Sequence, residues 1–393
     1  MREEREEEIE KRGGGGPERS GGERETAGSR NGRVYRHDRP FTLESGAVLP
    51  SLEIAYTTQG TLNSEGTNAL LVCHALTGSA HARDAKLPSG ETIPGWFNGV
   101  IGSGRGLDTE RFFVVASNIL GSCYGTSGPA SINPATGRAY RVEFPQMTVR
   151  DMVRAQKLLS DHLGIQRIVT AIGGSLGGMQ ALEWAVMYPE MIESIVPIAT
   201  AAQHSAWCIG ISEAQRLAIM SDPEWRGGYY TEQPARGLAI ARSVAMISYR
   251  SQPSFEERFG RRETVEGDGH ERIRLFPTIP LTYAVESYLR YQGQKLVDRF
   301  DANTYIYLSR AMDRHNLGAG RGNVRDVLGN LKARVLSIGI SSDILYPPAE
   351  QQEIAAAVPA GEYAELQSIH GHDAFLIEFD WLNAQLQRFL LRS

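Results

Sequence analysis

The sequence has few cysteines, no long apolar run and no excess of basic residues. Its three cysteines, Cys73, Cys123 and Cys208, lie far apart and show neither metal-ligand spacing nor a disulfide framework. No apolar run reaches the roughly 18–20 residues that a membrane span needs. The N-terminus carries charges but lacks the apolar segment of a secretory signal. These absences predict a protein of the reducing cytoplasm that does not enter a membrane.

The charge balance gives no electrostatic reason to expect a nucleic-acid partner. The 393 residues contain 41 Lys and Arg against 46 Asp and Glu, a formal net charge of −5. Hydrophobic residues make up 41% of the chain, which is enough for a sizeable core. The length predicts about two domains, or one large domain with an insertion.

Apolar residues are nearly absent from the first 32 positions. Glu and Arg dominate the first dozen residues, and Gly, Ser and Glu follow. Such a segment buries too little apolar surface to offset the entropy of ordering. We therefore expect residues 1–32 to be a disordered tail that takes no part in any site.

From residue 33 the pattern becomes that of an α/β protein. Apolar runs typical of strands buried on both faces alternate with runs of helical spacing. This alternation predicts a mostly parallel sheet flanked by helices, formed by residues 33–203 and 326–393. The expected strands are 41–49, 52–58, 69–76, 112–119, 167–172, 192–198, 334–340 and 363–369, and the expected helices are 149–163, 179–188 and 375–391.

The glycine-rich stretch Gly173-Gly174-Ser175-Leu176-Gly177 matches the nucleophile-elbow pattern G-x-S-x-G. A strand-like run precedes it and a helix-like run follows it, which is the context that the motif requires. The sharp turn holds its serine in a strained backbone conformation that only small neighbours permit. We therefore predict that Ser175 is a nucleophile; a glycine-rich turn without chemistry is the alternative.

Between residues 204 and 325 the strand rhythm stops and helical stretches take over. The expected helices are 211–219, 237–249, 281–298 and 303–313. An insertion after the strand that follows the elbow would lie above the carboxyl ends of the strands. A helical lid over Ser175 is the functional interpretation, and an extra packing layer is the alternative.

A serine nucleophile needs a base, and the base needs a carboxylate that orients it. On an elbow fold the chain order is Ser, then Asp or Glu, then His, each after a strand end. Asp343 follows the strand expected at 334–340, and both His370 and His372 follow the strand expected at 363–369. Position favours His372, which lies further into the loop. A turn aspartate and a histidine metal pair are the alternatives.

Two backbone N–H groups must stabilise the oxyanion. One should be that of Leu176, and the other should come from Leu76 or Thr77 after an early strand. The stretch 121–125 (Gly-Ser-Cys-Tyr-Gly) repeats the elbow pattern with Cys123 as nucleophile. Because no helix follows it, a thiolate there would lack electrostatic support. We interpret it as a pocket loop.

With these residues in view, the chain from about residue 33 to its end resembles the homoserine O-acetyltransferase family, acyltransferases of the α/β-hydrolase fold. The matching motifs are His-Ala-Leu-Thr-Gly at 74–78, Gly-Ser-Cys-Tyr-Gly-Thr at 121–126, Gly-Gly-Ser-Leu-Gly-Gly-Met-Gln at 173–180, Ser-Asp at 342–343 through Pro-Pro at 347–348, and Gly-His-Asp-Ala-Phe-Leu at 371–376.

The resemblance implies roles for several residues. Ser175 is acylated, and Asp343 and His372 complete its triad, which selects His372 over His370. Arg242 and Tyr249 match an arginine and a tyrosine seven residues apart that bind the amino acid, and Asp373 contacts its amine. An arginine suits a carboxylate, and an aspartate suits an ammonium. Arg250 is a rival for the role of Arg242.

The activity that the resemblance implies is acetyl transfer from acetyl-CoA to the hydroxyl of L-homoserine, a step toward methionine. It implies a co-substrate rather than a bound cofactor, no metal, and a homodimer formed through the lid helices. Succinyl-CoA as donor and serine as acceptor are rivals on the same fold. A serine esterase, and a member that only binds ligands, are rivals from other classes.

Overall fold

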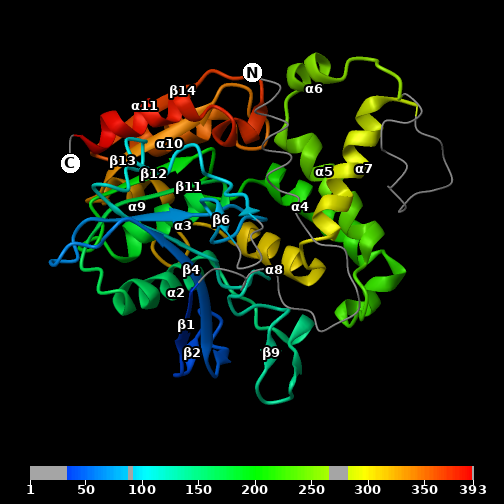
Figure 1. Cartoon of the computed structure of the whole chain (residues 1–393), viewed down its shortest axis with the longest axis horizontal. Coiled ribbons are helices and arrows are strands. Elements are labelled where there is room, and N and C mark those ends of the chain that lie inside the picture. The colour runs from blue at the N-terminus through cyan, green and yellow to red at the C-terminus, as the bar shows by residue number, and fades with distance from the viewer. Residues whose placement is uncertain (1–32, 87–91, 265–281, 392–393) are drawn as a thin grey trace.

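A computed structural model describes residues 33–86, 92–264 and 282–391; the tail predicted at 1–32 lies outside the described residues. The centre of the protein is an eight-stranded sheet with the order β1-β4-β8-β5-β11-β12-β13-β14 (Figure 1). The strands are β1 Arg33–His37, β4 Leu52–Gln59, β5 Ala69–Cys73, β8 Phe113–Ser117, β11 Ile168–Gly174, β12 Ser194–Ile198, β13 Arg334–Ile340 and β14 Gly361–Leu366.

Six neighbouring strands of this sheet, from β8 to β14, run parallel. At one edge β4 pairs antiparallel with β8, and β1 pairs antiparallel with β4. Every residue of β5, β11 and β12 is buried. Strands buried on both faces read as continuous apolar runs, which is why these three were recognisable in the sequence. Because the strands are parallel, their carboxyl ends meet at one edge.

Helices cover both faces of the sheet. On one face, α2 (Val149–His162), α3 (Leu176–Met187) and α10 (Pro348–Ala357) pack on one set of alternating strand side chains, such as Leu71. On the other face, α11 (Phe379–Leu390) packs on the opposite set, such as Val72. The two hydrophobic cores thus lie on either side of the sheet, as in other layered α/β proteins.

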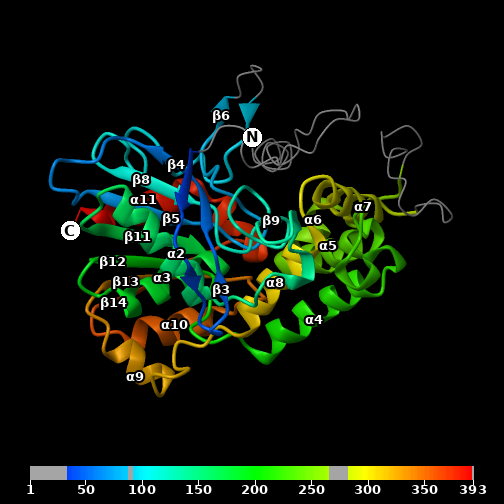
Figure 2. The ribbon, with the colours of Figure 1, turned by 90° about the horizontal axis from the view of Figure 1, so that it is seen from below.

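The described residues between β12 and β13 are mostly helical. It contains α4 (Ala206–Met220), α5 (Ala235–Tyr249), α6 (Gln252–Arg258), α7 (Ala284–Val297) and α8 (Ala302–Asp313), followed by the short α9 (Val324–Gly329). Figures 1 and 2 show α4, α5 and α7 gathered beside the sheet. Their close packing uses glycine, since a Cβ added at Gly293 of α7 would lie 2.9 Å from the Cβ of Ala239 in α5.

Several predicted elements differ from those observed. Residues 41–49 form no single strand but a small hairpin of β2 (Phe41–Thr42) and β3 (Val48–Leu49). On its outer side β4 pairs instead with β1, an exposed edge strand that has no apolar run to reveal it. The last helix begins at Phe379 rather than at 375, because Gly371–Leu376 forms a 3-10 turn.

The described residues of the helical segment contain no strand longer than an isolated bridge, such as that between Glu263 and Tyr283. None of the helices formed by residues 33–86, 92–264 and 282–391 has the length and apolar character needed to cross a membrane.

Candidate active site

Ser175 occupies the corner between β11 and α3. Its backbone has φ 57° and ψ −125°, in the left-handed half of conformational space that L-residues rarely adopt. The corner brings α3 close to β5. A Cβ added at Gly173 would lie 2.6 Å from the carbonyl oxygen of Cys73, and one at Gly177 would collide with that same oxygen. Glycine is therefore required at both positions.

Asp343, in the loop after β13, accepts three hydrogen bonds. Its Oδ1 accepts from the backbone N–H groups of Leu345 at 2.8 Å and Tyr346 at 3.0 Å, and its Oδ2 lies 2.8 Å from Nδ1 of His372. An ionised carboxylate only accepts, so Nδ1 of a neutral His372 carries the proton and Nε2 is free to act as a base. His372 is 3% exposed and Asp343 is 4% exposed.

The competing histidine has a different neighbour. Nε2 of His370 lies 4.0 Å from Oε1 of Glu378, near the start of α11. The structure therefore brings His372, and not His370, to the carboxylate of Asp343.

The 3-10 turn Gly371–Leu376 lies against the elbow. The ring of Phe375 packs on Gly174, where any Cβ would collide with it, and the ring centroids of Phe375 and His372 are 5.9 Å apart. Phe375 therefore brings the His372 turn beside the residue that precedes Ser175. The contact forms because residues 371–376 make a 3-10 turn and the last helix begins only at Phe379. Our prediction that this helix begins at residue 375 was wrong.

The electrostatic surroundings of His372 favour its protonated form. Burial by itself lowers the pKa of His372, but the charge and hydrogen bond of Asp343, with the charge of Asp373, outweigh burial and raise the pKa above its ordinary value. Three aromatic rings enclose the imidazole, those of Tyr249, Tyr346 and Phe375, at centroid distances of 5.6, 5.3 and 5.9 Å.

His74, which follows β5, holds the loop that carries Leu76. Its Nε2 accepts from the backbone N–H of Ile119 at 3.0 Å, so Nδ1 carries the proton and donates to the carbonyl of Ala75 at 2.7 Å. Burial lowers the pKa of His74 to about 4, so the ring stays neutral near pH 7. In the sequence His74 is visible only as part of the motif at 74–78, and no role was predicted for it.

A buried side-chain amide ties this loop to the elbow. Nε2 of Gln180 in α3 donates to the carbonyls of His74 and Leu176, each at 3.1 Å. Gln156 donates to Gln180 at 2.8 Å and accepts from the Trp184 indole at 2.7 Å, which fixes the orientation of both amides. These hydrogen-bonded amides were not predicted from the sequence, where polar residues at buried helix positions were their only signal.

Tyr249 and Arg242 both lie on α5, the helix whose end packs near His372. The Tyr249 ring packs near His372, and the Arg242 guanidinium lies 5.7 Å from the Tyr249 ring centroid. Burial raises the pKa of Tyr249, so its phenol remains protonated. The two residues predicted to bind the amino acid thus lie against each other, with Tyr249 next to the imidazole.

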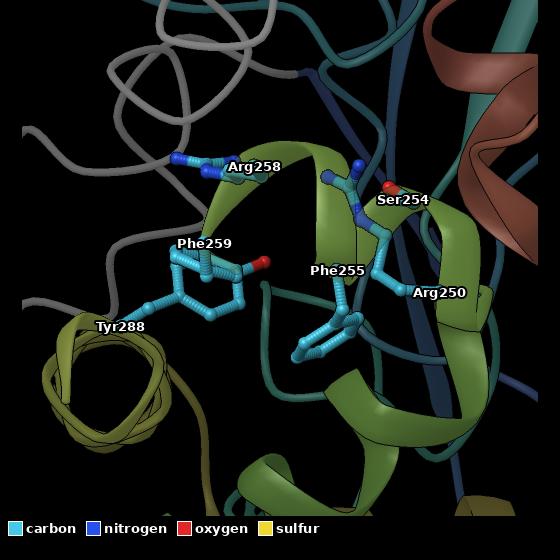
Figure 3. Close-up of a pocket in the computed structure, with 6 residues that line it drawn as sticks. All are labelled: Arg250, Ser254, Phe255, Arg258, Phe259 and Tyr288. Atoms are coloured by element: carbon cyan, nitrogen blue, oxygen red, sulfur yellow. The ribbon is translucent and has the colours of Figure 1, made fainter. Parts of the chain in front are cut away.

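Asp373 pairs with Arg250 rather than with Arg242. Nε of Arg250 lies 3.3 Å from Oδ2 of Asp373, and Arg250 also lines a pocket with Ser254, Phe255, Arg258, Phe259 and Tyr288 (Figure 3). The backbone at Arg250 packs closely against Gly371: a Cβ added at Gly371 would lie 2.8 Å from the Arg250 carbonyl carbon. The end of α5 is therefore fastened to the histidine turn.

The second elbow-like stretch does not form an elbow. Residues 121–125 lead into bends and turns rather than into a helix. Burial raises the pKa of the Cys123 thiol to about 12, with a further contribution from the charge of Asp301. A thiol with that pKa is almost wholly protonated at neutral pH, which argues against Cys123 as a nucleophile.

Within the described part of the chain, no three His, Cys, Asp or Glu side chains cluster in a way that could hold a metal ion.

The layered parallel sheet, the elbow serine and the buried His–Asp pair define an enzyme of the α/β-hydrolase class. The family model described as alpha/beta hydrolase fold matches residues 68–379. The chain is 51% identical to a homoserine O-acetyltransferase of Moorella thermoacetica, over 91% of this chain and 95% of that protein. The chain therefore belongs to the homoserine O-acetyltransferase family of the α/β-hydrolase fold.

Solved structures agree on the fold and include two kinds of enzyme. A homoserine O-acetyltransferase from Bacillus anthracis aligns with a TM-score of 0.82 at 29% identity, covering 92% of this chain and 97% of that one. An esterase, E22, aligns with a TM-score of 0.81 at 28% identity, covering 92% of this chain and 99% of that one.

The elbow geometry predicts that Gly177→Ala destabilises the protein. The new methyl group collides with the buried carbonyl of Cys73, so we expect the free energy of unfolding to fall by about 1–3 kcal/mol. Urea unfolding followed by tryptophan fluorescence measures the change.

The matched control is Gly210→Ala in α4, where an added Cβ meets nothing within 4 Å. Alanine replaces a helical glycine there, and we expect a gain of about 0.5–1 kcal/mol. Equal effects of the two substitutions would contradict the proposed steric limit at the elbow.

Proposed function

We propose that this protein transfers an acetyl group from acetyl-CoA to the hydroxyl of L-homoserine through an acyl-Ser175 intermediate, in methionine biosynthesis. The observation that carries the proposal is the buried His372–Asp343 pair, held in the turn whose Phe375 packs on Gly174, the residue before the elbow serine. The substrates are proposed from the chain's similarity, over nearly its whole length, to relatives named homoserine O-acetyltransferase.

In the first step, Nε2 of His372 takes the proton of the Ser175 hydroxyl while Oγ attacks the thioester carbonyl. The resulting oxyanion accepts hydrogen bonds from the N–H of Leu176 and from that of Leu76. Support for the second donor comes from His74 and Gln180, which hold the loop at 74–76. The intermediate collapses, CoA leaves with the proton from His372, and acetyl-Ser175 remains.

In the second step, His372 takes the proton from the homoserine hydroxyl, which attacks the acetyl carbonyl of acetyl-Ser175. A second oxyanion forms and collapses, the Ser175 oxygen leaves and regains a proton from His372, and O-acetyl-L-homoserine is released. One base thus serves both halves of a ping-pong reaction.

Arg242, Tyr249 and Asp373 are proposed to hold the zwitterionic part of homoserine. Arg242 would bind its carboxylate and Asp373 its ammonium. The proposal is supported by the Tyr249 ring, which packs near His372, and by the Arg242 guanidinium, which lies over that ring. In this structure Arg250 already pairs with Asp373, so binding of the amine requires Asp373 to share or exchange that partner.

Helices α4 to α8 are proposed to form a lid domain, residues 204–325, inserted in a core of residues 33–203 and 326–393. Tyr249, at the end of α5, reaches the His372 ring and thereby brings this segment to the site. A transferase must keep water from its acyl-enzyme until the acceptor arrives, and a cover over the serine would serve this purpose.

A homodimer through the lid helices, in the cytoplasm, completes the proposal. Its support is a set of exposed apolar side chains on α4 and α5, among them Trp207 at 58%, Leu217 at 54% and Ile247 at 54% exposure. Apolar groups that gather into one exposed patch are typical of surfaces that a partner covers.

The proposed reaction predicts release of CoA only when acetyl-CoA and L-homoserine are both present in steady state. The assay offers acetyl-CoA or succinyl-CoA, each with L-homoserine, L-serine or no acceptor, and a thiol reagent measures the CoA. Ser175→Ala is expected to lose at least about 10³-fold in rate.

Other outcomes distinguish the rivals. Release of CoA that depends on succinyl-CoA or on L-serine would support the mechanism but identify a different acyl donor or acceptor. Steady release that no acceptor accelerates would favour an esterase-like hydrolase, the activity in the name of the similar structure E22. Full activity in Ser175→Ala would refute the proposed nucleophile.

Arg242→Met is predicted to raise the KM for L-homoserine and leave the KM for acetyl-CoA unchanged. Loss of a charged hydrogen-bonding partner of a carboxylate costs about 1.5–3 kcal/mol, which is roughly ten- to hundred-fold. Arg236→Met is the control, because Arg236 is exposed on the same helix. An equal rise in both variants, or a rise in the acetyl-CoA KM alone, would argue against the assignment.

The pKa of His372 predicts an acid limb in the rate of Ser175 acylation. The base must be neutral, so the rate falls as the pH drops through a pKa that lies above the ordinary value for histidine. Asp373→Asn removes one of the charges that raise this pKa, so the limb should move to lower pH. p-Nitrophenyl acetate is the substrate, since it lacks an amine for Asp373 to bind.

Glu190→Gln controls for net charge in this experiment, because the Glu190 side chain is 81% exposed and its partner is the exposed Lys332. It should leave the acid limb where it is. An acid limb that Asp373→Asn does not move, or moves to higher pH, would contradict the electrostatic account of His372.

A further inference from the structure

The peptide group between Ser175 and Leu176 is held from its carbonyl side. Its N–H, that of Leu176, is the proposed oxyanion donor. Its carbonyl oxygen, that of Ser175, accepts from Oγ1 of Thr200 at 2.7 Å and from the N–H groups of Gly178 and Met179 at 2.9 and 3.2 Å. Because a peptide group is planar, a bond that fixes the direction of the carbonyl also fixes that of the N–H.

Thr200 is aimed at this carbonyl by a strained turn. Ala199, directly after β12, has φ 44°, a value that residues other than glycine rarely adopt. The Ala199 N–H donates to the carbonyl of Ile338 in β13 at 2.8 Å, and the side-chain amide of Gln351 donates to the carbonyl of Thr200. Strain of this kind persists where the surroundings over-determine a conformation, and it gathers at functional sites.

The helix of the elbow makes room for Thr200. A Cβ added at Gly178 would lie 2.6 Å from Cγ2 and 3.0 Å from Oγ1 of Thr200. Thr200 is fully buried, and a β-branched side chain has few χ1 rotamers, so its hydroxyl has little freedom to turn away. Of the two glycines after the elbow serine, Gly177 thus permits the elbow and Gly178 permits the contact with Thr200.

We propose that Thr200 is a positioning residue of the oxyanion hole: its hydroxyl orients the Ser175–Leu176 peptide and polarises the Leu176 N–H toward the oxyanion. A hydrogen bond to a carbonyl strengthens the donor at the other end of the same peptide group. The inference deepens the proposed function, since it rests on the proposed roles of Ser175 and Leu176.

The second proposed donor shows the same arrangement. The N–H of Leu76 belongs to the peptide group whose carbonyl is that of Ala75, and this carbonyl accepts from Nδ1 of His74 at 2.7 Å. A buried side chain therefore holds the carbonyl end of each donor peptide. This repetition on two unrelated loops favours a function in orienting the donors over an incidental contact.

The test is Thr200→Val, which removes the hydroxyl and keeps the shape. We measure burst acylation of Ser175 by p-nitrophenyl acetate, and binding of methylboronic acid, which forms a tetrahedral adduct with a serine. Loss of a whole oxyanion donor costs 10²–10³-fold, so loss of its orientation should lower the acylation rate by roughly ten- to hundred-fold. The KM should stay nearly constant, and boronate affinity should fall in parallel.

Thr200→Ser should restore most of the rate, because it returns the hydroxyl. Thr170→Val is the matched control: Thr170 is a fully buried threonine of β11 whose hydroxyl bonds to Ser194, away from the elbow. It should lower the unfolding midpoint without changing acylation or boronate binding. If Thr200→Val does not fold, Thr200→Cys carries the same test, because a thiol is a weak donor.

A wild-type acylation rate and boronate affinity in Thr200→Val would overturn the proposal, and so would an equal loss of rate in Thr170→Val. Neither reagent involves CoA or homoserine. If the wild-type protein is acylated by p-nitrophenyl acetate but does not transfer an acetyl group to homoserine, the proposed substrates are refuted. The comparison of the Thr200 variants then still decides the role of Thr200. An unmodified protein that is not acylated would refute both.

Discussion

The close approach of α3 to β5 at the elbow is the constraint on which the site depends. Gly173 and Gly177 lie so near the carbonyl of Cys73 that no side chain fits at either position. This contact forces the sharp turn that holds Ser175 at a positive φ. The strained serine then stands at the start of α3, where free N–H groups face the site, and the packed strands on either side support the strain.

The carboxyl edge of the sheet carries Asp343 and His372, and the end of α5 packs against the turn that holds His372. Asp343 follows β13 and the His372 turn follows β14, so neighbouring parallel strands deliver both to one side of the elbow. Ser251, just after α5, donates to the carbonyl of Ile369, and Gly371 lies against the same segment. Any movement of α5 would therefore act directly on the proposed base.

Burial and charge divide the two histidines of the site into different roles. His74 is kept neutral by burial and serves through a fixed tautomer, with one nitrogen accepting from Ile119 and the other donating to Ala75. His372 is as deeply buried, but Asp343 and Asp373 raise its pKa and suit it to exchange protons. The same side chain thus orients a backbone in one place and can act as a base in another, according to the carboxylates around it.

The sequence by itself determined the features that depend on neighbours along the chain. The elbow, the buried strands β5, β11 and β12, and the α/β alternation could be predicted because glycine spacing and apolar periodicity are local properties. What only the tertiary structure decided are contacts between distant segments: the pairing of Asp373 with Arg250, the bond from Thr200 to the Ser175 carbonyl, and the 3-10 turn that places Phe375 on Gly174. Position along the chain favoured His372 over His370 as the base, and the family resemblance selected it, but only the fold shows that the ring of His372 meets Asp343. A side chain's partner across the fold leaves no pattern in its own stretch of sequence, so it appears only once the strands have been brought side by side.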